Sequence, residues 1–208
     1  YGFLCSAAAS DNNPYKSKTI LSERSLPTLK AIILYGSRYG SARRYAEELS
    51  EQTGIPTADY KNAPPLSDKN VIVYLGGLYA GGLPGLVKTF RGVSLRNLQR
   101  LIIVTVGLSD PQEPENRKNI LHSLQKQLPN ALLDKTNIFH LRGSIDYTKL
   151  RLAHRTMMAL LYRSLQKKPA EEWSAEDRAL AETYGRKADF VDFSTLRPII
   201  KEIQREVK

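Results

Sequence analysis

The chain has 208 residues, of which 41% are hydrophobic and 25% charged, so it is long enough for one globular domain and is neither disordered nor fibrous. Its formal charge of +10 favours anionic ligands or partners, but no long basic block, zinc finger or RNP motif is present, and we expect no nucleic-acid partner. The single cysteine, Cys5, excludes an intrachain disulfide and a cysteine-cluster metal site, and no apolar run reaches the roughly 18 residues of a membrane-spanning helix. We therefore expect a basic, cytoplasmic protein without a metal site.

The first quarter of the chain contains a tail followed by a strand, a helix and a second strand. Residues 1–29 have neither helical nor strand periodicity and are predicted to form a tail or arm. Residues 31–35 (AIILY) are a continuous apolar run, typical of a strand buried on both faces. Residues 41–52 have apolar side chains at helical spacing and are predicted to form a helix that ends before Gly54. Residues 57–60 are a weaker strand candidate.

The same alternation continues through the middle of the chain. Strands are predicted at residues 71–75 (VIVYL), 101–106 (LIIVTV) and 137–141 (NIFHL). Helices are predicted between them, at residues 84–92, with Pro84 in the first turn, and at 115–128. Strands that alternate with helices at this spacing predict an α/β fold, with a doubly wound parallel sheet of about five strands and helices on both faces.

The C-terminal third is predicted to be helical, with a helical insertion at about residues 148–190. Residues 149–168 form an amphipathic pattern, with one face made by Leu150, Ala153, Met157, Leu160, Leu161 and Leu165. The segment has six basic residues and no acidic one: Lys149, Arg151, Arg155, Arg163, Lys167 and Lys168. Two interpretations are open: the apolar face packs on the domain, or the helix contacts an anionic membrane or an acidic partner. A helix beginning at Ser174 and a final helix at residues 195–207, covering the sheet, complete the prediction.

Each strong strand ends in a loop rich in glycine or serine: residues 36–42, 76–85 and 107–114. Ligands of such sheets bind beyond the carboxyl ends of the strands, so the three loops are expected to form one site. In the first loop, backbone N–H groups, the start of the next helix and the hydroxyls of Ser37 and Ser41 form a cradle suited to a monophosphate. The loop has neither the lysine of a P-loop nor the glycine spacing of a dinucleotide fingerprint.

Residues 34–41 (LYGSRYGS), 76–82 (GGLYAGG) and 105–111 (TVGLSDP) resemble the three flavin-contacting loops of flavodoxin-domain proteins. The branch that the chain most resembles includes the menaquinone-dependent protoporphyrinogen dehydrogenases and uncharacterised bacterial flavodoxin-domain proteins. Residues 140–147 (HLRGSIDY) and 154–158 (HRTMM) are similar to the uncharacterised group. The resemblance runs from Lys30 to the C-terminus and implies a flavodoxin-like fold with FMN as the cofactor.

The resemblance also implies which residues contact FMN. The first loop would hold the phosphate, through Ser37, Arg38, Tyr39, Gly40, Ser41 and Ala42. The second would lie along the isoalloxazine, through Leu78, Tyr79, Ala80, Gly81 and Gly82, with Tyr79 as the stacking ring. The third would flank the other side of the ring, through Val106, Gly107, Leu108, Ser109 and Asp110. The chain departs from the family pattern at Arg38 and Tyr39, where small residues are usual, and lacks an aromatic residue in the third loop.

Three functions remain open at this point: an FMN protein that transfers electrons, a quinone-linked flavoenzyme of the protoporphyrinogen dehydrogenase type, and a non-catalytic domain of the same fold. The expected partner is a redox protein or a quinone, with peripheral contact at the inner membrane face through residues 149–168. Arg38, Arg43 and Arg44 are expected to favour anionic reduced flavin. His154 and the pair Met157 and Met158 are predicted to be core residues, as is Trp173, and no catalytic residue is identified. A proton donor near the flavin is the alternative role for His154.

Overall fold

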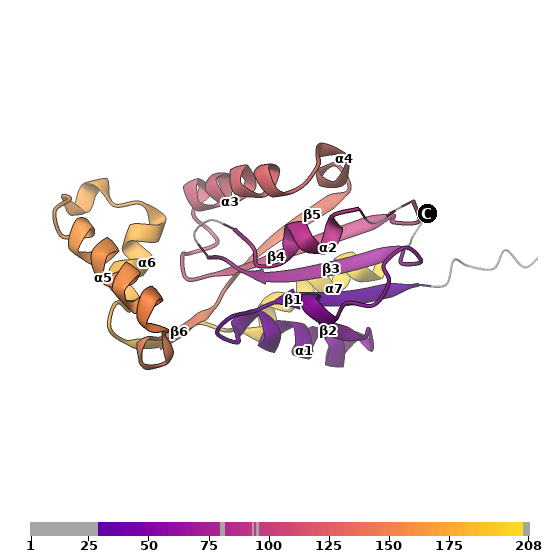
Figure 1. Ribbon diagram of the computed structural model, residues 1–208, viewed down its shortest axis with the longest axis horizontal. Helices are drawn as coiled ribbons and strands as arrows, with labels where there is room; N and C mark the ends of the chain where they lie inside the picture. Colours follow the sequence, from indigo (N-terminus) through magenta and orange to yellow (C-terminus); the bar gives the residue numbers. More distant parts are fainter. Residues whose placement is uncertain (1–28, 80–81, 93, 95, 206–208) are drawn as a thin grey trace, which may run out of the picture.

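The computed structural model describes residues 29–79, 82–92, 94 and 96–205; the predicted tail lies outside the described residues except for Leu29. Its centre is a parallel sheet of five strands in the order β2-β1-β3-β4-β5 (Figure 1). The strands are β1 (Ala31–Gly36), β2 (Thr57–Asp59), β3 (Val71–Gly77), β4 (Arg100–Gly107) and β5 (Thr136–Arg142). The predicted doubly wound α/β fold is therefore confirmed.

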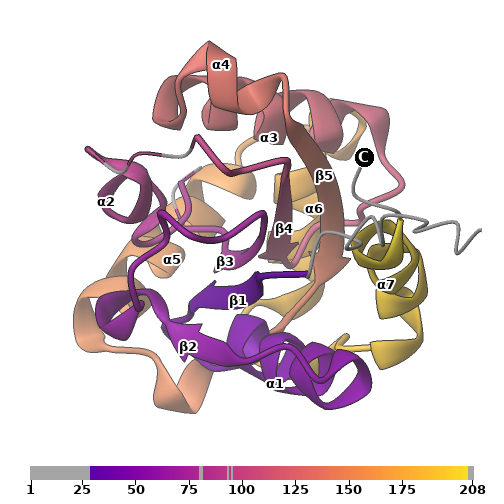
Figure 2. The same ribbon diagram turned by 90° about the vertical axis from the view of Figure 1, so that its right-hand side faces the viewer.

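Helices cover both faces of the sheet because the buried strands carry apolar side chains on both sides (Figure 2). In β1, Ile33 packs with α1 (Ser41–Thr53) and α7 (Arg197–Gln204), whereas Ile32 packs with the opposite layer. That opposite layer contains α2 (Leu86–Phe90), α3 (Pro114–Gln127) and the short α4 (Asn130–Leu133). The continuous apolar runs thus fill two separate cores. Among the described helices, none has the length and apolarity needed to cross a membrane.

Two predicted helices are shorter than expected. Pro84 precedes α2 instead of lying in its first turn, because Gly85 takes a left-handed conformation with φ 83° and begins the helix later. A Cβ at Gly85 would overlap the ring of Tyr60, so that turn also needs a glycine for space. The final helix divides into a 3₁₀ turn, η4 (Phe193–Leu196), followed by α7. Another 3₁₀ turn, η1 (Tyr60–Asn62), follows β2.

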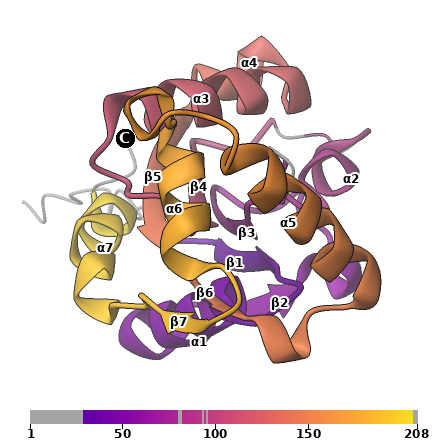
Figure 3. The same ribbon diagram turned by 90° about the vertical axis from the view of Figure 1, so that its left-hand side faces the viewer.

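The segment of residues 144–189 forms a second unit beyond the carboxyl ends of the sheet strands, at the left of Figure 1. An antiparallel pair, β6 (Ser144–Asp146) and β7 (Lys187–Asp189), connects it to the core; the sequence analysis missed both strands because each has only three residues. Between them lie η2 (Tyr147–Lys149), α5 (Leu152–Leu165), η3 (Ala170–Glu172) and α6 (Ala175–Thr183). Figure 3 shows α5 and α6 in front of the strand ends, where a ligand of such a sheet binds.

Candidate functional site

A cavity of about 670 Å³ lies between the carboxyl ends of the sheet strands and the helices α5 and α6. This volume is within the range of roughly 300–1,000 Å³ that is usual for small-molecule sites. The cavity is lined by most of the predicted loop residues: Ser37, Arg38, Tyr39, Ser41, Ala42, Leu78, Tyr79, Val106, Gly107, Leu108 and Ser109. Three predicted residues, Gly40, Gly82 and Asp110, are not among the lining residues, and Ala80 and Gly81 lie outside the described part of the chain.

The first loop presents the N-terminus of α1 to the cavity. Gly40 is the N-cap residue with φ 99°, and no side chain caps the helix or places an acidic group in its first turn. Ser37 instead accepts a hydrogen bond from the Gly40 N–H at 3.1 Å, which closes the turn before the helix. The first N–H groups of an α-helix have no intrahelical partner and carry a partial positive charge. Because Ala42 lines the cavity from the first turn, these groups are available to an anion bound there.

Ser41 lines the cavity, and its hydroxyl also bonds to a residue outside the first loop. Its hydroxyl accepts a hydrogen bond from the Ser144 N–H at 2.9 Å and lies 2.8 Å from the Ser144 hydroxyl. Ser41 therefore connects the start of α1 to β6. Gly143 allows this close approach, since a Cβ there would lie 3.0 Å from Val106 Cγ1 and 3.2 Å from Ser41 Cβ. This contact is not predictable from local sequence pattern, because it joins positions more than a hundred residues apart.

The second loop holds Tyr79 against the first. The Tyr79 and Tyr39 rings are 6.1 Å apart between centroids, and the Arg38 guanidinium lies 5.3 Å from the Tyr79 centroid. Gly77 lets Tyr79 pack closely, because a Cβ there would lie 2.8 Å from Tyr79 Cε2. Burial raises the pKa of the Tyr79 hydroxyl, so it remains protonated at neutral pH. The Leu78 N–H donates to the Val106 carbonyl at 2.8 Å, which joins the second loop to β4.

His154 connects α5 to the first loop. Arg38 Nη1 lies 3.1 Å from His154 Nε2, and the Tyr39 hydroxyl is hydrogen-bonded to His154 Nδ1. A guanidinium can only donate, so Nε2 accepts and the neutral ring carries its proton on Nδ1. That N–H donates to the Tyr39 oxygen and leaves the Tyr39 O–H proton free to donate elsewhere. The prediction that His154 is a core residue is wrong: it lines the cavity and takes its partners from a loop.

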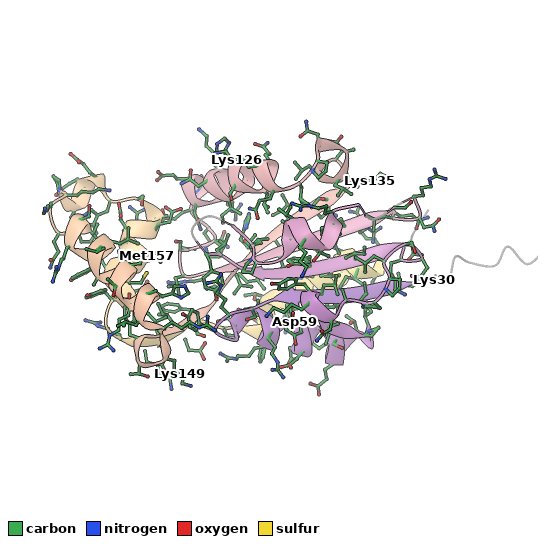
Figure 4. All side chains as sticks on the ribbon, viewed as in Figure 1. Lys30, Asp59, Lys126, Lys135, Lys149 and Met157 are labelled. Atoms are coloured by element: carbon green, nitrogen blue, oxygen red, sulfur yellow. The ribbon has the colours of Figure 1, made fainter. Side chains whose placement is uncertain are left out.

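The opposite wall of the cavity is apolar and comes mainly from α5 and α6. Met157 (Figure 4) and Met158 line the cavity, so the prediction that they belong to the core is wrong. Leu160 is 59% exposed and is not a lining residue, so the predicted apolar face of α5 is divided between cavity and solvent. Trp173 is also no core residue; it is half-buried and its Nε1 donates to the Lys168 carbonyl at 3.3 Å.

Stacked aromatic rings hold the two helices of this wall together. Tyr162 of α5 and Tyr184, which ends α6, have ring centroids 3.9 Å apart and planes within 4° of parallel. Ser174 and Asp177 form the predicted capping box at the start of α6. The sequence analysis identified the box but not the lining residue Leu180, because the pattern of α6 does not show what its apolar face covers.

The three arginines near the first loop differ in whether an acidic residue balances their charge. Arg43 pairs with Glu47 at 2.7 Å and Arg44 with Asp189 at 2.8 Å, and both pairs lie at the surface. Their charges are therefore largely balanced, which corrects the expectation that three arginines act on a flavin together. Arg38 makes no ion pair within the part of the chain that the structure describes, so it supplies the unbalanced positive charge at the first loop.

A half-buried histidine, His140, also lines the cavity. His140 Nδ1 lies 2.7 Å from the Thr105 hydroxyl, across neighbouring strands β5 and β4. Burial, and to a smaller extent the charge of Arg117, lowers the pKa of His140, so the ring is neutral at pH 7. No group of three or more metal-ligating side chains gathers among the residues that the structure describes.

Comparison with known proteins identifies the family. The family model described as "Flavodoxin domain" matches residues 32–172. The chain belongs to this flavodoxin-domain family. The match of this flavodoxin domain extends through the three loops and α5 and ends before α6 begins. A search of curated proteins found no match.

Solved structures similar to this flavodoxin domain share only a small part of its sequence. A flavoprotein in complex with FMN from Lactobacillus acidophilus is 14% identical, with a TM-score of 0.37, and the match covers 54% of this chain and 91% of that one. A flavodoxin from the domain Archaea is 14% identical, with a TM-score of 0.35 and coverage of 54% and 82%. An NAD(P)H:quinone oxidoreductase from Methanothermobacter marburgensis is 12% identical, with a TM-score of 0.40 and coverage of 61% and 89%. Similarity at this level does not indicate what this flavodoxin domain binds.

Proposed function

We propose that this flavodoxin domain binds FMN in the cavity and transfers electrons through the flavin. The observation that carries the proposal is the meeting, around one cavity of about 670 Å³, of the loops that follow β1, β3 and β4 with the uncapped N-terminus of α1. When bound, FMN supplies one- or two-electron redox chemistry that amino-acid side chains lack.

The donors of the first loop fit a phosphate group. The first turn of α1 has unpartnered N–H groups, no acidic side chain and no capping side chain. Arg38 adds a positive charge without an ion pair among the described residues. The cavity therefore combines hydrogen-bond donors with positive potential at one end, as a phosphate monoester requires.

The other loops fit a flat ring. Leu78 and Tyr79 present an aliphatic and an aromatic surface, and residues 106–109 of the third loop line the same cavity beside them. The hydrogen bond from the Leu78 N–H to the Val106 carbonyl sets the spacing between these loops. In this arrangement Tyr79 orients the ring, and the Tyr39 O–H can donate a proton to a ligand atom beside it.

The apolar wall favours a second, more specific candidate: a quinone-linked flavoenzyme of the protoporphyrinogen dehydrogenase type. Beyond the loops, the cavity continues along Leu150, which follows η2, and along apolar side chains of α5 and α6: Met157, Met158, Leu161, Leu165 and Leu180. A flavin alone does not need this extension, whereas an apolar acceptor beside it does. To test this candidate, the photoreduced FMN-loaded protein is mixed with a menaquinone analogue or with ferricyanide. Leu161→Asn should slow reoxidation by the menaquinone analogue and leave reoxidation by ferricyanide unchanged.

The binding of FMN is tested by a charge placed at Ser37. Its hydroxyl accepts from the Gly40 N–H, and both Asp and Asn can accept the same bond, so Ser37→Asp and Ser37→Asn differ only in charge. A carboxylate about 5 Å from a phosphate charge, at an effective dielectric constant of about 20, costs about 3 kcal/mol. Ser37→Asp should therefore weaken FMN binding by about 100-fold in a fluorescence titration.

Riboflavin, which lacks the phosphate, is the matched ligand for this titration. Its affinity should change less than threefold or so in either variant, because no phosphate charge is present to repel. Equal weakening of FMN and riboflavin by Ser37→Asp would place the phosphate elsewhere. Wild-type protein that binds no added FMN would leave the third interpretation, a non-catalytic domain of the same fold.

A further inference from the structure

The most exposed large hydrophobic side chains of the described residues gather on one helix. Leu152 is 79% exposed, Leu160 is 59% exposed and Leu161 is 50% exposed, and all three belong to α5. Helices of globular proteins normally turn their large apolar side chains towards the core. Exposed apolar side chains that cluster in this way mark a surface that contacts something else.

Leu161 lines the cavity, whereas the two most exposed leucines, Leu152 and Leu160, lie on the side of α5 that faces away from it. At about 100° per residue, Leu152 and Leu160 are about 80° apart around the helix, and Met158 and Leu165 lie roughly opposite them. Met158 and Leu165 line the cavity, whereas Leu152 and Leu160 do not. The apolar residues on the inner side of α5 are thus accounted for by the cavity. The leucines on its outer side neither line the cavity nor belong to the buried core.

An arginine lies three residues after each of Leu152 and Leu160. Arg155 follows Leu152 by three residues and Arg163 follows Leu160 by three residues, so each arginine lies beside a leucine on the helix surface. Both arginines are exposed, and neither makes an ion pair within the described part of the chain. We name these four residues, Leu152, Arg155, Leu160 and Arg163, the outer face of α5.

The chain segment that contains the outer face carries charge of one sign. The segment 149–168 has six basic residues and no acidic one. Lys168 is balanced by Asp177 at 3.1 Å, but that pair lies beyond the end of α5. The nearest acidic residues that follow in the chain, Glu171 and Glu172, belong to η3. The outer face therefore combines apolar side chains with an excess of positive charge.

We propose that the outer face of α5 docks on an anionic lipid surface. Leucines can enter the boundary of the acyl region while arginines reach phosphate groups with their long side chains. The helix lies at one end of the molecule, beyond the sheet, so it can lie flat on a plane (Figure 1). The two leucines are about 12 Å apart along the helix axis at 1.5 Å per residue, which suits a surface more than a single small pocket. This inference is independent of FMN binding, although docking would place the apolar cavity wall next to the membrane.

Vesicle co-sedimentation of the full chain tests the charge contribution. The protein should bind vesicles that contain phosphatidylglycerol, should not bind pure phosphatidylcholine, and should dissociate as salt is raised. Each basic side chain near an anionic surface contributes about fivefold, so Arg155→Gln with Arg163→Gln should weaken binding by about 25-fold. The matched control changes two exposed lysines of α3 to Gln, Lys118 and Lys126, of which Lys126 is labelled in Figure 4. This control removes the same charge and should weaken binding less than threefold or so.

Insertion of the leucines is tested separately. Leu152→Gln with Leu160→Gln keeps the charge and should weaken binding by about tenfold or more, with the circular dichroism spectrum unchanged because both positions are exposed. A polarity-sensitive fluorophore at Leu152→Cys, in a chain with Cys5→Ser, should brighten on anionic vesicles. The same fluorophore at Leu121→Cys, which is 44% exposed on α3, should not.

Three results would overturn the proposal. A lack of binding to anionic vesicles would leave an acidic protein as the partner of this face. Equal loss of binding in the α3 and α5 charge variants would show that overall charge, and not the outer face, is responsible. A fluorophore at position 152 that remains in water on bound vesicles would exclude insertion.

Discussion

Gly36, at the start of the first loop, lies against the backbone of Pro84 in the second loop. Replacing Gly36 with alanine should therefore destabilise the fold. Gly36 ends β1, and a Cβ there would overlap the carbonyl oxygen of Pro84 and lie 2.9 Å from the Tyr74 hydroxyl. The same carbonyl accepts the hydrogen bond of that hydroxyl. Because Pro84 contributes backbone atoms and not a flexible side chain, the overlap can be relieved only by moving the backbone at the end of the second loop.

The expected magnitude follows from these contacts. Tyr74 is fully buried, so separating its hydroxyl from the Pro84 carbonyl leaves an unsatisfied polar group that costs about 1–3 kcal/mol. Overpacking at a close backbone contact costs a further 1–3 kcal/mol or so. We therefore expect Gly36→Ala to lower the free energy of unfolding by about 3 kcal/mol, a large part of the roughly 5–15 kcal/mol usual for a domain.

Urea unfolding followed by circular dichroism measures this loss, and Gly82→Ala is the matched control. The nearest atom to a Cβ at Gly82 would be Gln127 Oε1 at 3.5 Å, an ordinary contact, and Gly82 has no positive φ. The control should change stability by less than about 1 kcal/mol in either direction. A loss below about 1 kcal/mol for Gly36→Ala, or equal losses in the two variants, would refute the close contact as the cause.

Two further predictions concern histidines that line the cavity. The pKa of His140 in the folded chain is lower than the ordinary histidine pKa of 6.5. As the pH falls below 6.5, the unfolded chain therefore binds a proton that the folded chain does not. Stability should therefore fall from pH 7 to pH 5, and His140→Gln should lose less stability over this range, as measured by urea midpoints. Equal losses in the two proteins would contradict a neutral His140 ring with a lowered pKa. His154→Phe keeps a ring but removes both hydrogen bonds to the first loop, so hydrogen exchange of α5 amides should speed up by about tenfold while β3 remains protected. Unchanged exchange in α5 would show that other contacts hold the helix.

The strands and α1 were predictable because each is determined by short-range pattern. The runs at residues 31–35, 71–75 and 101–106 have no polar side that could face water except Thr105, so they are buried on both faces wherever they pair. The helical spacing of Tyr45 and Leu49 directs both into the core. The two three-residue strands β6 and β7 escaped prediction because so short a segment has no readable period.

The sequence by itself determined the parallel α/β fold and the loops at the carboxyl edge of its sheet, because buried strands and crossover helices leave few arrangements. Only the tertiary structure determined which distant residues contact these loops. Tyr39 is hydrogen-bonded to His154, which is 115 residues further along the chain, and Arg44 to Asp189, which is 145 residues further along. No local helical or strand pattern in the sequence predicts either contact. The two sides of α5 were separated in the same way: its sequence is apolar around much of the helix, and the position of the cavity determines which leucines remain in water.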